Sequence, residues 1–444
     1  MPTRRTFTRA AALAPLATAV SYRNILGAND RVRLGWIGVG NRGDQLLDAF
    51  LPHPDAEVVA IADAYEPYLA PAKSKAGGKA RTGKDYRALL DSKDIDAVVI
   101  ATPDHWHALQ FVDACRAGKH VYVEKPASLT IGEGRVMCRV AEETHRVTQV
   151  GLHRRSAKFV QEAVEALKSG AIGKISFARC YHLRNEAPMG IGRPADGEPP
   201  AGLDWDLWLG PAPKAAFNTN KALYKFRWFN DYSGGQLTNM GTHYLDIIQW
   251  GLGHDAPLRI ASLGGNYVVN DNRDIPDTME TVWEYPGCLV TFTQINGNGA
   301  VANARGWDME FRGTHGTLLI GPSSYEIIPE SIRTKELPAL SPIAREANSQ
   351  DGRAVKPARA GVVVKGNADT THHARNFLDA IKGTAKANCP IETGHRSTTA
   401  TLLGKLALMR RQILEWDAKT ERVTNDQQAN KLLTYEYRRP WKLA

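Results

Sequence analysis

Residues 32–47, VRLGWIGVGNRGDQLL, decide the fold of the N-terminal part of the chain. An apolar strand at 32–39 runs into the turn Gly38-Val39-Gly40-Asn41-Arg42-Gly43, and a helix is expected through residues 44–51. The first glycine permits a tight turn, the second lets the backbone approach a pyrophosphate, and the third lets the helix pack close to the sheet. Because a helix N-terminus favours anions, this turn predicts a dinucleotide-binding site.

Strands and helices alternate from this turn to Gly151. Short apolar runs at 57–62, 96–101, 120–123 and 148–150 are separated by helical patterns. This alternation implies crossover connections and a parallel sheet that is covered on both faces. The sequence therefore predicts an α/β fold whose N-terminal Rossmann domain, a doubly wound parallel sheet, spans residues 31–150.

Asp63 closes the second predicted strand, about twenty residues beyond Gly43. A carboxylate there accepts hydrogen bonds from the adenosine ribose and repels a 2′-phosphate, so NAD is the expected cofactor and NADP is less favoured. The remaining expected cofactor contacts lie at two later strand ends on the same sheet edge: Thr102, Pro103, His107, Glu124 and Lys125.

The pattern changes after Gly151. Helices are expected at 156–169 and 236–252, and hairpin-spaced strands follow between residues 260 and 320. This spacing favours an α+β domain over residues 151–444 with an open, largely antiparallel or mixed sheet. A polar stretch at about 323–369 predicts a flexible loop, and two helices are expected near 372–382 and 395–416.

Two side chains are candidates for proton transfer. Lys125 would stand beside a bound nicotinamide ring, where burial and the cationic ring lower the pKa of an amine. On the helix after Gly234-Gly235, Asn239, His243 and Asp246 follow at steps of four and three and so share one face. His243 is a candidate base because the ordinary pKa of histidine lies near neutrality. Taken singly, a surface lysine and a structural histidine are the commoner explanations.

Composition excludes several other classes of protein. The chain carries 56 Lys and Arg against 47 Asp and Glu, a formal charge of +9, but the basic residues are scattered and no nucleic-acid partner is expected. The five cysteines form no CxxC pair, and His105 and His107 have no third ligand nearby, so no metal site is expected. No segment is long and apolar enough for a membrane span.

The first residues indicate export. Arg4-Arg5 precede a short, weakly apolar run at 10–20, a pattern typical of a twin-arginine signal. We therefore expect a signal over residues 1–28 and a periplasmic or exported protein; a disordered basic N-terminus is the alternative.

Several motifs together resemble the glucose–fructose oxidoreductase and inositol dehydrogenase (Gfo/Idh/MocA) family. They are GVGNRG at 38–43, ATPDHWHA at 101–108, AGKHVYVEKP at 117–126, GLHRR at 151–155, GGQLTNMGTHYLD at 234–246 and FRGTHGTL at 311–318. The resemblance implies a Rossmann domain followed by an α/β domain whose open sheet forms homo-oligomer contacts. It also implies NAD(P) as cofactor and a sugar or polyol as substrate.

The resemblance also assigns roles to individual residues. It implies that Lys125 and His243 are the catalytic pair, with a cis bond before Pro126. One departure is Asn239, since the family commonly has Asp there; either Asp246 or Tyr244 compensates, or the chemistry is altered. The expected substrate-binding residues are Arg155, Asn239, Tyr244 and Asp246.

Three functions fit these features. The first is a dehydrogenase that passes hydride from a hydroxyl carbon of a sugar or polyol to nicotinamide. The second is a glycosidase or lyase that oxidises its substrate transiently and regains the hydride, with no net oxidation; export favours it because free NAD is scarce outside the cytoplasm. The third is a non-catalytic sugar-binding protein, which the presence of both Lys125 and His243 disfavours.

Two aromatic segments bear on the substrate. The rings at 205–208 and at 224–228 could stack on a pyranose. They could equally belong to the core or to an oligomer contact, so the sequence leaves their role open.

Overall fold

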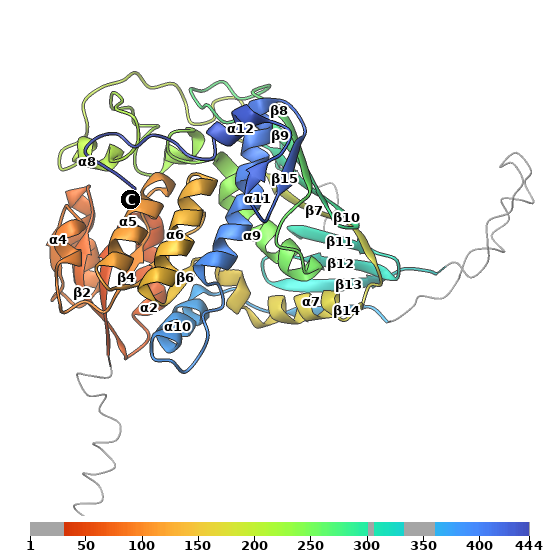
Figure 1. Ribbon diagram of the computed structural model, residues 1–444, viewed down its shortest axis with the longest axis horizontal. Helices are drawn as coiled ribbons and strands as arrows, with labels where there is room; N and C mark the ends of the chain where they lie inside the picture. The colour runs from red at the N-terminus through yellow and green to blue at the C-terminus, as the bar shows by residue number, and fades with distance from the viewer. Residues whose placement is uncertain (1–30, 301–305, 333–359, 444) are drawn as a thin grey trace, which may run out of the picture.

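The computed structural model describes residues 31–300, 306–332 and 360–443 (Figure 1). In this part of the chain, an N-terminal α/β domain lies against a C-terminal domain built on one large sheet. The predicted export signal at 1–28 lies outside the described residues. Among the described helices, none is both long and apolar enough to cross a membrane.

The N-terminal domain is the predicted doubly wound fold. Six parallel strands are arranged in the order β3-β2-β1-β4-β5-β6, so the order reverses between β1 and β4. The strands are β1 (Val32–Ile37), β2 (Ala56–Ala62), β3 (Arg81–Gly83), β4 (Ala97–Ile100), β5 (His120–Val123) and β6 (Thr148–Val150). The helices around them are α2 (Asn41–Phe50), η2 (Glu66–Tyr68), α3 (Leu69–Lys75), α4 (Arg87–Leu90), α5 (Asp104–Arg116) and α6 (Ile131–Thr144). Every residue of β4 is buried, as expected for a strand covered on both faces.

The C-terminal domain is the predicted α+β domain. Its ten-stranded sheet has the order β14-β13-β12-β11-β7-β10-β9-β8-β15-β16, in which β7 and β10 are parallel and the other neighbouring pairs are antiparallel. Its strands are β7 (Ile175–Leu183), β8 (Arg259–Gly265), β9 (Thr278–Tyr285), β10 (Cys288–Ile295), β11 (Met309–Gly313), β12 (Gly316–Ile320), β13 (Ser324–Pro329), β14 (Val362–Lys365), β15 (Leu414–Asp417) and β16 (Arg422–Val423).

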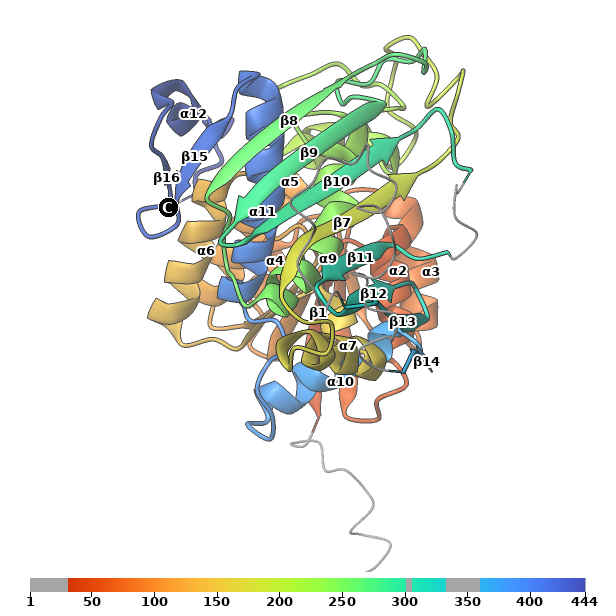
Figure 2. The ribbon, with the colours of Figure 1, turned by 90° about the vertical axis from the view of Figure 1, so that its right-hand side faces the viewer.

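Helices cover one face of this sheet. Trp283 and Phe292, which project from β9 and β10, pack with Leu245 and Leu403 in one buried cluster. The other face is turned away from the helices, as Figure 2 shows. The helices of this part are η3 (His153–Ser156), α7 (Lys158–Lys168), α8 (Trp205–Leu209), η4 (Lys225–Trp228), α9 (Gly235–Leu252), α10 (Thr370–Ile381), α11 (Ile391–Arg410) and α12 (Gln427–Lys431).

Two expectations about the C-terminal part were wrong. The predicted loop at 323–369 contains β13 and β14 at its two ends, where Val362–Lys365 pair with the strand from Ser324; residues 333–359 lie outside the described part. The helix predicted at 395–416 ends at Arg410, where Arg411 adopts a left-handed conformation with φ 54°, and the chain then forms β15. Alternating Leu414 and Trp416 fit a strand as well as a helix, and pairing with β8 decides between them.

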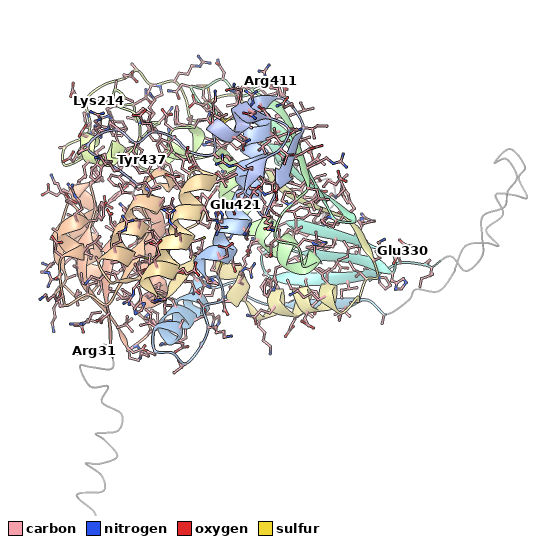
Figure 3. All side chains as sticks on the ribbon, viewed as in Figure 1. Arg31, Lys214, Glu330, Arg411, Glu421 and Tyr437 are labelled. Atoms are coloured by element: carbon pink, nitrogen blue, oxygen red, sulfur yellow. The ribbon has the colours of Figure 1, made fainter. Side chains whose placement is uncertain are left out.

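The C-terminal part of the chain also packs against the N-terminal domain. Phe377 of α10 packs edge-on against Phe50 of α2 with ring centroids 6.4 Å apart. Arg375 and Lys382 bind the carboxylate of Asp55 at 2.7 and 2.5 Å. The C-terminal tail returns to α6, where the Tyr437 hydroxyl donates to Glu133 at 2.5 Å; Figure 3 shows Tyr437 beside the N-terminal helices. The two domains are therefore joined at several places along their boundary.

Candidate active site

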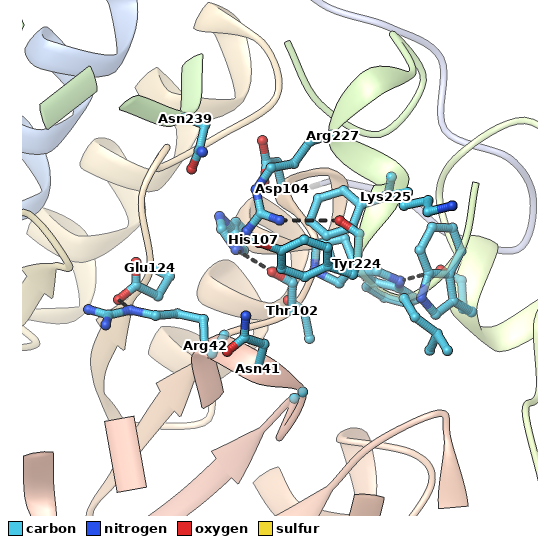
Figure 4. A pocket seen from close by; sticks show the side chains of 18 of the residues that line it. Asn41, Arg42, Thr102, Asp104, His107, Glu124, Tyr224, Lys225, Arg227 and Asn239 are labelled. Carbon is cyan, nitrogen blue, oxygen red and sulfur yellow. Dashed lines mark hydrogen bonds and ion pairs between the residues drawn. The ribbon is translucent and has the colours of Figure 1, made fainter. Parts of the chain in front are cut away.

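A pocket of about 810 Å³ lies at the carboxyl ends of the N-terminal strands, where the second domain covers them (Figure 4). This is the edge at which open α/β sheets bind ligands. Eleven predicted site residues line it: Gly38, Gly40, Asn41, Arg42, Asp63, Thr102, Pro103, His107, Glu124, Lys125 and Asn239. Five others do not: Gly43, Arg155, His243, Tyr244 and Asp246.

The glycine turn leaves room for a pyrophosphate. Gly38 has φ 85°, and a Cβ atom on it would lie 2.9 Å from the backbone nitrogen of Thr102. Gly40 precedes α2, so the first-turn amide groups of Asn41 and Arg42, which have no partner inside the helix, lie at the pocket wall. The turn therefore fits the phosphates of a dinucleotide.

Gly43 has a packing role beneath the pocket. A Cβ atom at this position would lie 2.1 Å from the carbonyl oxygen of Gly38, so any side chain pushes α2 away from β1. We expect Gly43→Ala to weaken NADH binding and to cost about 1–3 kcal/mol of stability. Titration of NADH fluorescence and urea unfolding measure the two effects. Gly197→Ala is the matched control, since nothing lies within 4 Å of its Cβ position and its backbone is not left-handed; equal NADH affinity in Gly43→Ala and the wild type would contradict the assignment.

Asp63 lies where an adenosine ribose is expected. Its two carboxylate oxygens accept hydrogen bonds from the backbone N–H groups of Val39 and Tyr65, both at 2.8 Å. These bonds fix the carboxylate at the end of β2, and each oxygen retains a further lone pair for a ribose hydroxyl. These acceptor oxygens thus fit NAD, whose ribose carries a 2′-hydroxyl.

Arg42 and Glu124 contact each other. Arg42 Nε and Glu124 Oε1 are 2.8 Å apart, and the glutamate is 3% exposed. Burial acts to raise the pKa of Glu124, but the charges of Arg42 and Lys125 outweigh it and hold the pKa below its usual value. The pocket wall therefore carries the positive charge of Arg42 and the negative charge of Glu124 side by side.

Lys125 reaches across the pocket to the second domain. Its Nζ donates to Asn239 Oδ1 at 2.5 Å, and the Asn239 amide donates in turn to Gln236 at 2.9 Å. Burial lowers the pKa of Lys125 to about 8; Glu124 acts against this shift, and the charge of Arg227 adds to it. The peptide bond between Lys125 and Pro126 is cis, as the resemblance implied. Lys125 is therefore an amine that can change its protonation state near working pH.

His243 lies behind the pocket wall. It is 6% exposed, and its ring meets that of His153 edge-on with centroids 5.1 Å apart. Nδ1 of neither ring has a hydrogen-bond partner among the described residues. Burial, followed by the charge of Lys125, holds the pKa of His243 well below its ordinary value, so the ring is neutral at pH 7.

The suggested substitutes for the family's aspartate do not contact His243 Nδ1. Asp246 accepts hydrogen bonds from Arg155 at 2.8 Å and from Ser397 at 2.7 Å. The ring of Tyr244 lies against the guanidinium of Arg154 at 5.4 Å. Arg155, Tyr244 and Asp246 are thus packed between α9 and its neighbours, outside the pocket where substrate was expected to reach them.

Thr102 and His107 make their hydrogen bonds within the protein. His107 is 1% exposed, and its ring nitrogens lie 2.7 Å from the carbonyl oxygen of Pro126 and 2.8 Å from that of Thr102. The Thr102 hydroxyl donates to Gln110 at 2.7 Å. Both line the pocket, but His107 joins the ends of β4 and β5 to each other, and the Thr102 hydroxyl is bound to α5.

Sequence reasoning missed the wall that the second domain supplies. This wall comes from β7 and from the aperiodic stretch before α9, and includes His182, Arg184, Glu186, Arg227 and Trp228. The available signals were the aromatic segments at 205–208 and 224–228, whose role the sequence leaves open; Trp208 of the first segment also lines the pocket. Phe226 and Trp228 are buried, whereas Tyr224 is 63% exposed at the pocket mouth.

Comparisons with known protein families agree with this architecture. Residues 32–152 match the GFO_IDH_MocA family described as "Oxidoreductase family, NAD-binding Rossmann fold". Residues 191–295 and 359–443 match the C-terminal alpha/beta domain of the same oxidoreductase family.

Solved structures share the fold. A levoglucosan dehydrogenase in complex with NADH and levoglucosan superposes with a TM-score of 0.62 at 18% identity, covering 87% of this chain and 99% of that chain. The WlbA dehydrogenase from Bordetella pertussis, in complex with NADH and UDP-GlcNAcA, gives a TM-score of 0.63 at 18% identity, covering 87% and 98%.

Curated relatives match over a shorter range. The glycosyl hydrolase family 109 protein 1 of Shewanella sp. (strain MR-4) is 37% identical over 123 residues, 26% of this chain and 27% of that protein. An alpha-N-acetylgalactosaminidase of Shewanella oneidensis has the same identity over the same length. The match thus spans about a quarter of the length of these relatives.

Proposed function

This chain belongs to the Gfo/Idh/MocA oxidoreductase family, and we propose that it transfers hydride between a hydroxyl carbon of a sugar-type substrate and NAD. The observation that carries the proposal is Lys125, a half-buried amine at the pocket wall with a pKa of about 8. Bound NAD supplies the hydride acceptor. NADH and sugar ligands in two structures of this fold support the same substrate class.

Each part of the pocket has a role in this reaction. The first turn of α2 and the Asp63 carboxylate bind the phosphates and the ribose of the cofactor. Lys125 accepts the proton of the substrate hydroxyl at Nζ, and Asn239 holds Nζ in place through its 2.5 Å hydrogen bond. Neutral His243 lies behind this pair, and its lowered pKa makes it the weaker proton acceptor of the two, so Lys125 is the proposed base.

The second candidate is an NAD-dependent glycosidase with no net oxidation. It is favoured by the glycosyl hydrolase family 109 relatives, which are similar over about a quarter of the chain. Lys125 and Asn239 would serve both reactions, because each begins by removing the hydroxyl proton.

One experiment separates the two reactions. The purified protein with stoichiometric NAD is mixed with sugars and with their aryl glycosides, and reduced nicotinamide and released aglycone are followed by absorbance in the same cuvette. A dehydrogenase accumulates reduced cofactor without aglycone. Aglycone release without net reduction would refute the dehydrogenase and establish the glycosidase; absence of both signals across the panel would favour a non-catalytic sugar-binding protein.

We also propose export by the twin-arginine route and a homo-oligomer through the ten-stranded sheet. The export proposal rests on Arg4-Arg5 and on the weakly apolar run at 10–20 that follows them. The oligomer proposal is supported by apolar side chains on the uncovered sheet face, where Leu263 and Leu289 are 76% and 43% exposed. Cell fractionation and light scattering of the purified protein test the two proposals.

The pH dependence of turnover should move when Asn239 is replaced by aspartate. Wild-type kcat/KM should rise with pH and level off above pH 8, because only the neutral amine of Lys125 accepts a proton. A carboxylate at position 239 stabilises the ammonium form and raises the pKa of Lys125 by about 1–3 units. The rising limb of Asn239→Asp should therefore lie at least about one pH unit higher. An unchanged limb would mean that Lys125 is not the titrating base.

A further inference from the structure

Arg227 is a partly buried arginine at the pocket wall that has no carboxylate partner among the described residues. Other arginines near the domain boundary are paired: Arg42 with Glu124 at 2.8 Å, Arg155 with Asp246 at 2.8 Å, and Arg273 with Asp271 at 2.6 Å. Within the described part of the chain, Arg227 makes one hydrogen bond, from Nη1 to the carbonyl oxygen of Tyr224 at 3.2 Å. A guanidinium carries five N–H donors, so most of those of Arg227 remain available.

The guanidinium is held in place by aromatic rings. It lies 5.2 Å from the ring centroid of Tyr224 and 5.0 Å from that of Phe226. Contact with a ring face leaves the edge of a guanidinium, where the N–H groups lie, free to bind an acceptor. Figure 4 shows Arg227 reaching into the pocket from the segment that carries Tyr224 and Lys225.

The two glutamates that line this end of the pocket already have arginine partners. Glu186 binds Arg273 at 2.9 Å, and Glu124 binds Arg42. Asp104 is buried and accepts a hydrogen bond from Ser233 at 2.6 Å. Arg184 lines the same pocket and, within the described ranges, also has no carboxylate within ion-pair distance. Arg227 and Arg184 thus lack a paired carboxylate at the substrate end of the pocket, where the charge of Asp104 acts on Lys125.

We propose that the substrate carries an oxyanionic group, a carboxylate or a phosphate, which Arg227 binds in the pocket beside Lys125. The proposal rests on the proposed function, since it names the substrate class for the same site. An oxyanion matches the free edge of a guanidinium, which binds two oxygens side by side. It also offsets the repulsion between Arg227 and Lys125, since the charge of Arg227 acts to lower the pKa of Lys125. Arg184, exposed at the same wall, adds attraction for an anion that approaches from solvent.

Ligand affinity tests the proposal without requiring turnover. The full-length protein saturated with NADH is titrated with glucose, glucuronate and glucose 6-phosphate, and quenching of tryptophan fluorescence gives each Kd. We expect at least one charged sugar to bind about tenfold or more tightly than glucose, and Arg227→Gln to remove that difference. A preference for glucuronate identifies a carboxylate, and a preference for glucose 6-phosphate a phosphate.

Two further variants keep the result interpretable. Arg227→Lys retains the charge but loses the two-oxygen geometry, so it should keep only part of the preference. Lys221→Gln removes the same charge from the same segment at a residue that does not line the pocket, and should keep all of it. Equal affinity for glucose and both charged sugars, or an equal loss of preference in Lys221→Gln and Arg227→Gln, would overturn the proposal. Because these are binding constants, they measure the role of Arg227 even if hydride transfer fails.

Discussion

Replacing Lys125 by methionine should lower kcat/KM by about 10²- to 10⁴-fold, the usual contribution of a positioned acid or base. The physical reason is that Nζ, held 2.5 Å from Asn239 Oδ1, is an amine in the pocket with a pKa of about 8. Methionine fills the same space without a proton acceptor. Steady-state kinetics with the best substrate of the panel measure the loss, and NADH fluorescence checks that the cofactor site is unchanged.

Arginine at the same position separates the two possible roles of the lysine. If Lys125 acts by accepting a proton, Lys125→Arg should be as inactive as Lys125→Met, because a guanidinium does not deprotonate in proteins. If it acts only through its positive charge, Lys125→Arg should keep much of the rate. Turnover of Lys125→Met within about tenfold of the wild type would remove Lys125 from the chemistry.

The cofactor half of the site could be predicted because it is local in sequence. The glycine turn, Asp63 and the ends of β4 and β5 each follow directly from a strand, and parallel strands bring their carboxyl ends to one edge. Backbone geometry alone therefore places Gly38 against Thr102, 64 residues later, without any knowledge of side-chain packing.

The substrate half could not be predicted for the opposite reason. Arg227 and Glu186 come from a stretch without periodicity. Its path is fixed by contacts with Arg273, which pairs with Glu186 and lies over the buried ring of Trp228. On α9, spacing correctly placed Asn239, His243 and Asp246 on related turns. It did not show that, of these three residues, only Asn239 lines the pocket. A helix face about 10 Å long can contact a cavity at one end and a buried ion pair at the other.

Asp246→Ala should therefore lower the free energy of unfolding and leave the affinity for sugar almost unchanged. Asp246 is 1% exposed, and the side chain of its partner Arg155 is 11% exposed. Removing the carboxylate therefore leaves the largely buried guanidinium of Arg155 without a counter-charge. Breaking a buried pair on one side costs about 3–5 kcal/mol, since the remaining charge stays out of water. Urea unfolding of the NADH-free protein measures this loss.

Two controls make the comparison decisive. Asp246→Asn keeps an acceptor for Ser397 and Arg155 but no charge, so its loss should be smaller. Glu284→Ala breaks an exposed pair with Arg259, in which the arginine and glutamate side chains are 54% and 41% exposed, and should cost no more than about 1 kcal/mol. Sugar affinity of the folded Asp246→Ala protein should match that of the wild type. If the variant instead unfolds at the wild-type urea concentration and binds sugar much more weakly, the carboxylate reaches the substrate and the expectation from sequence was right.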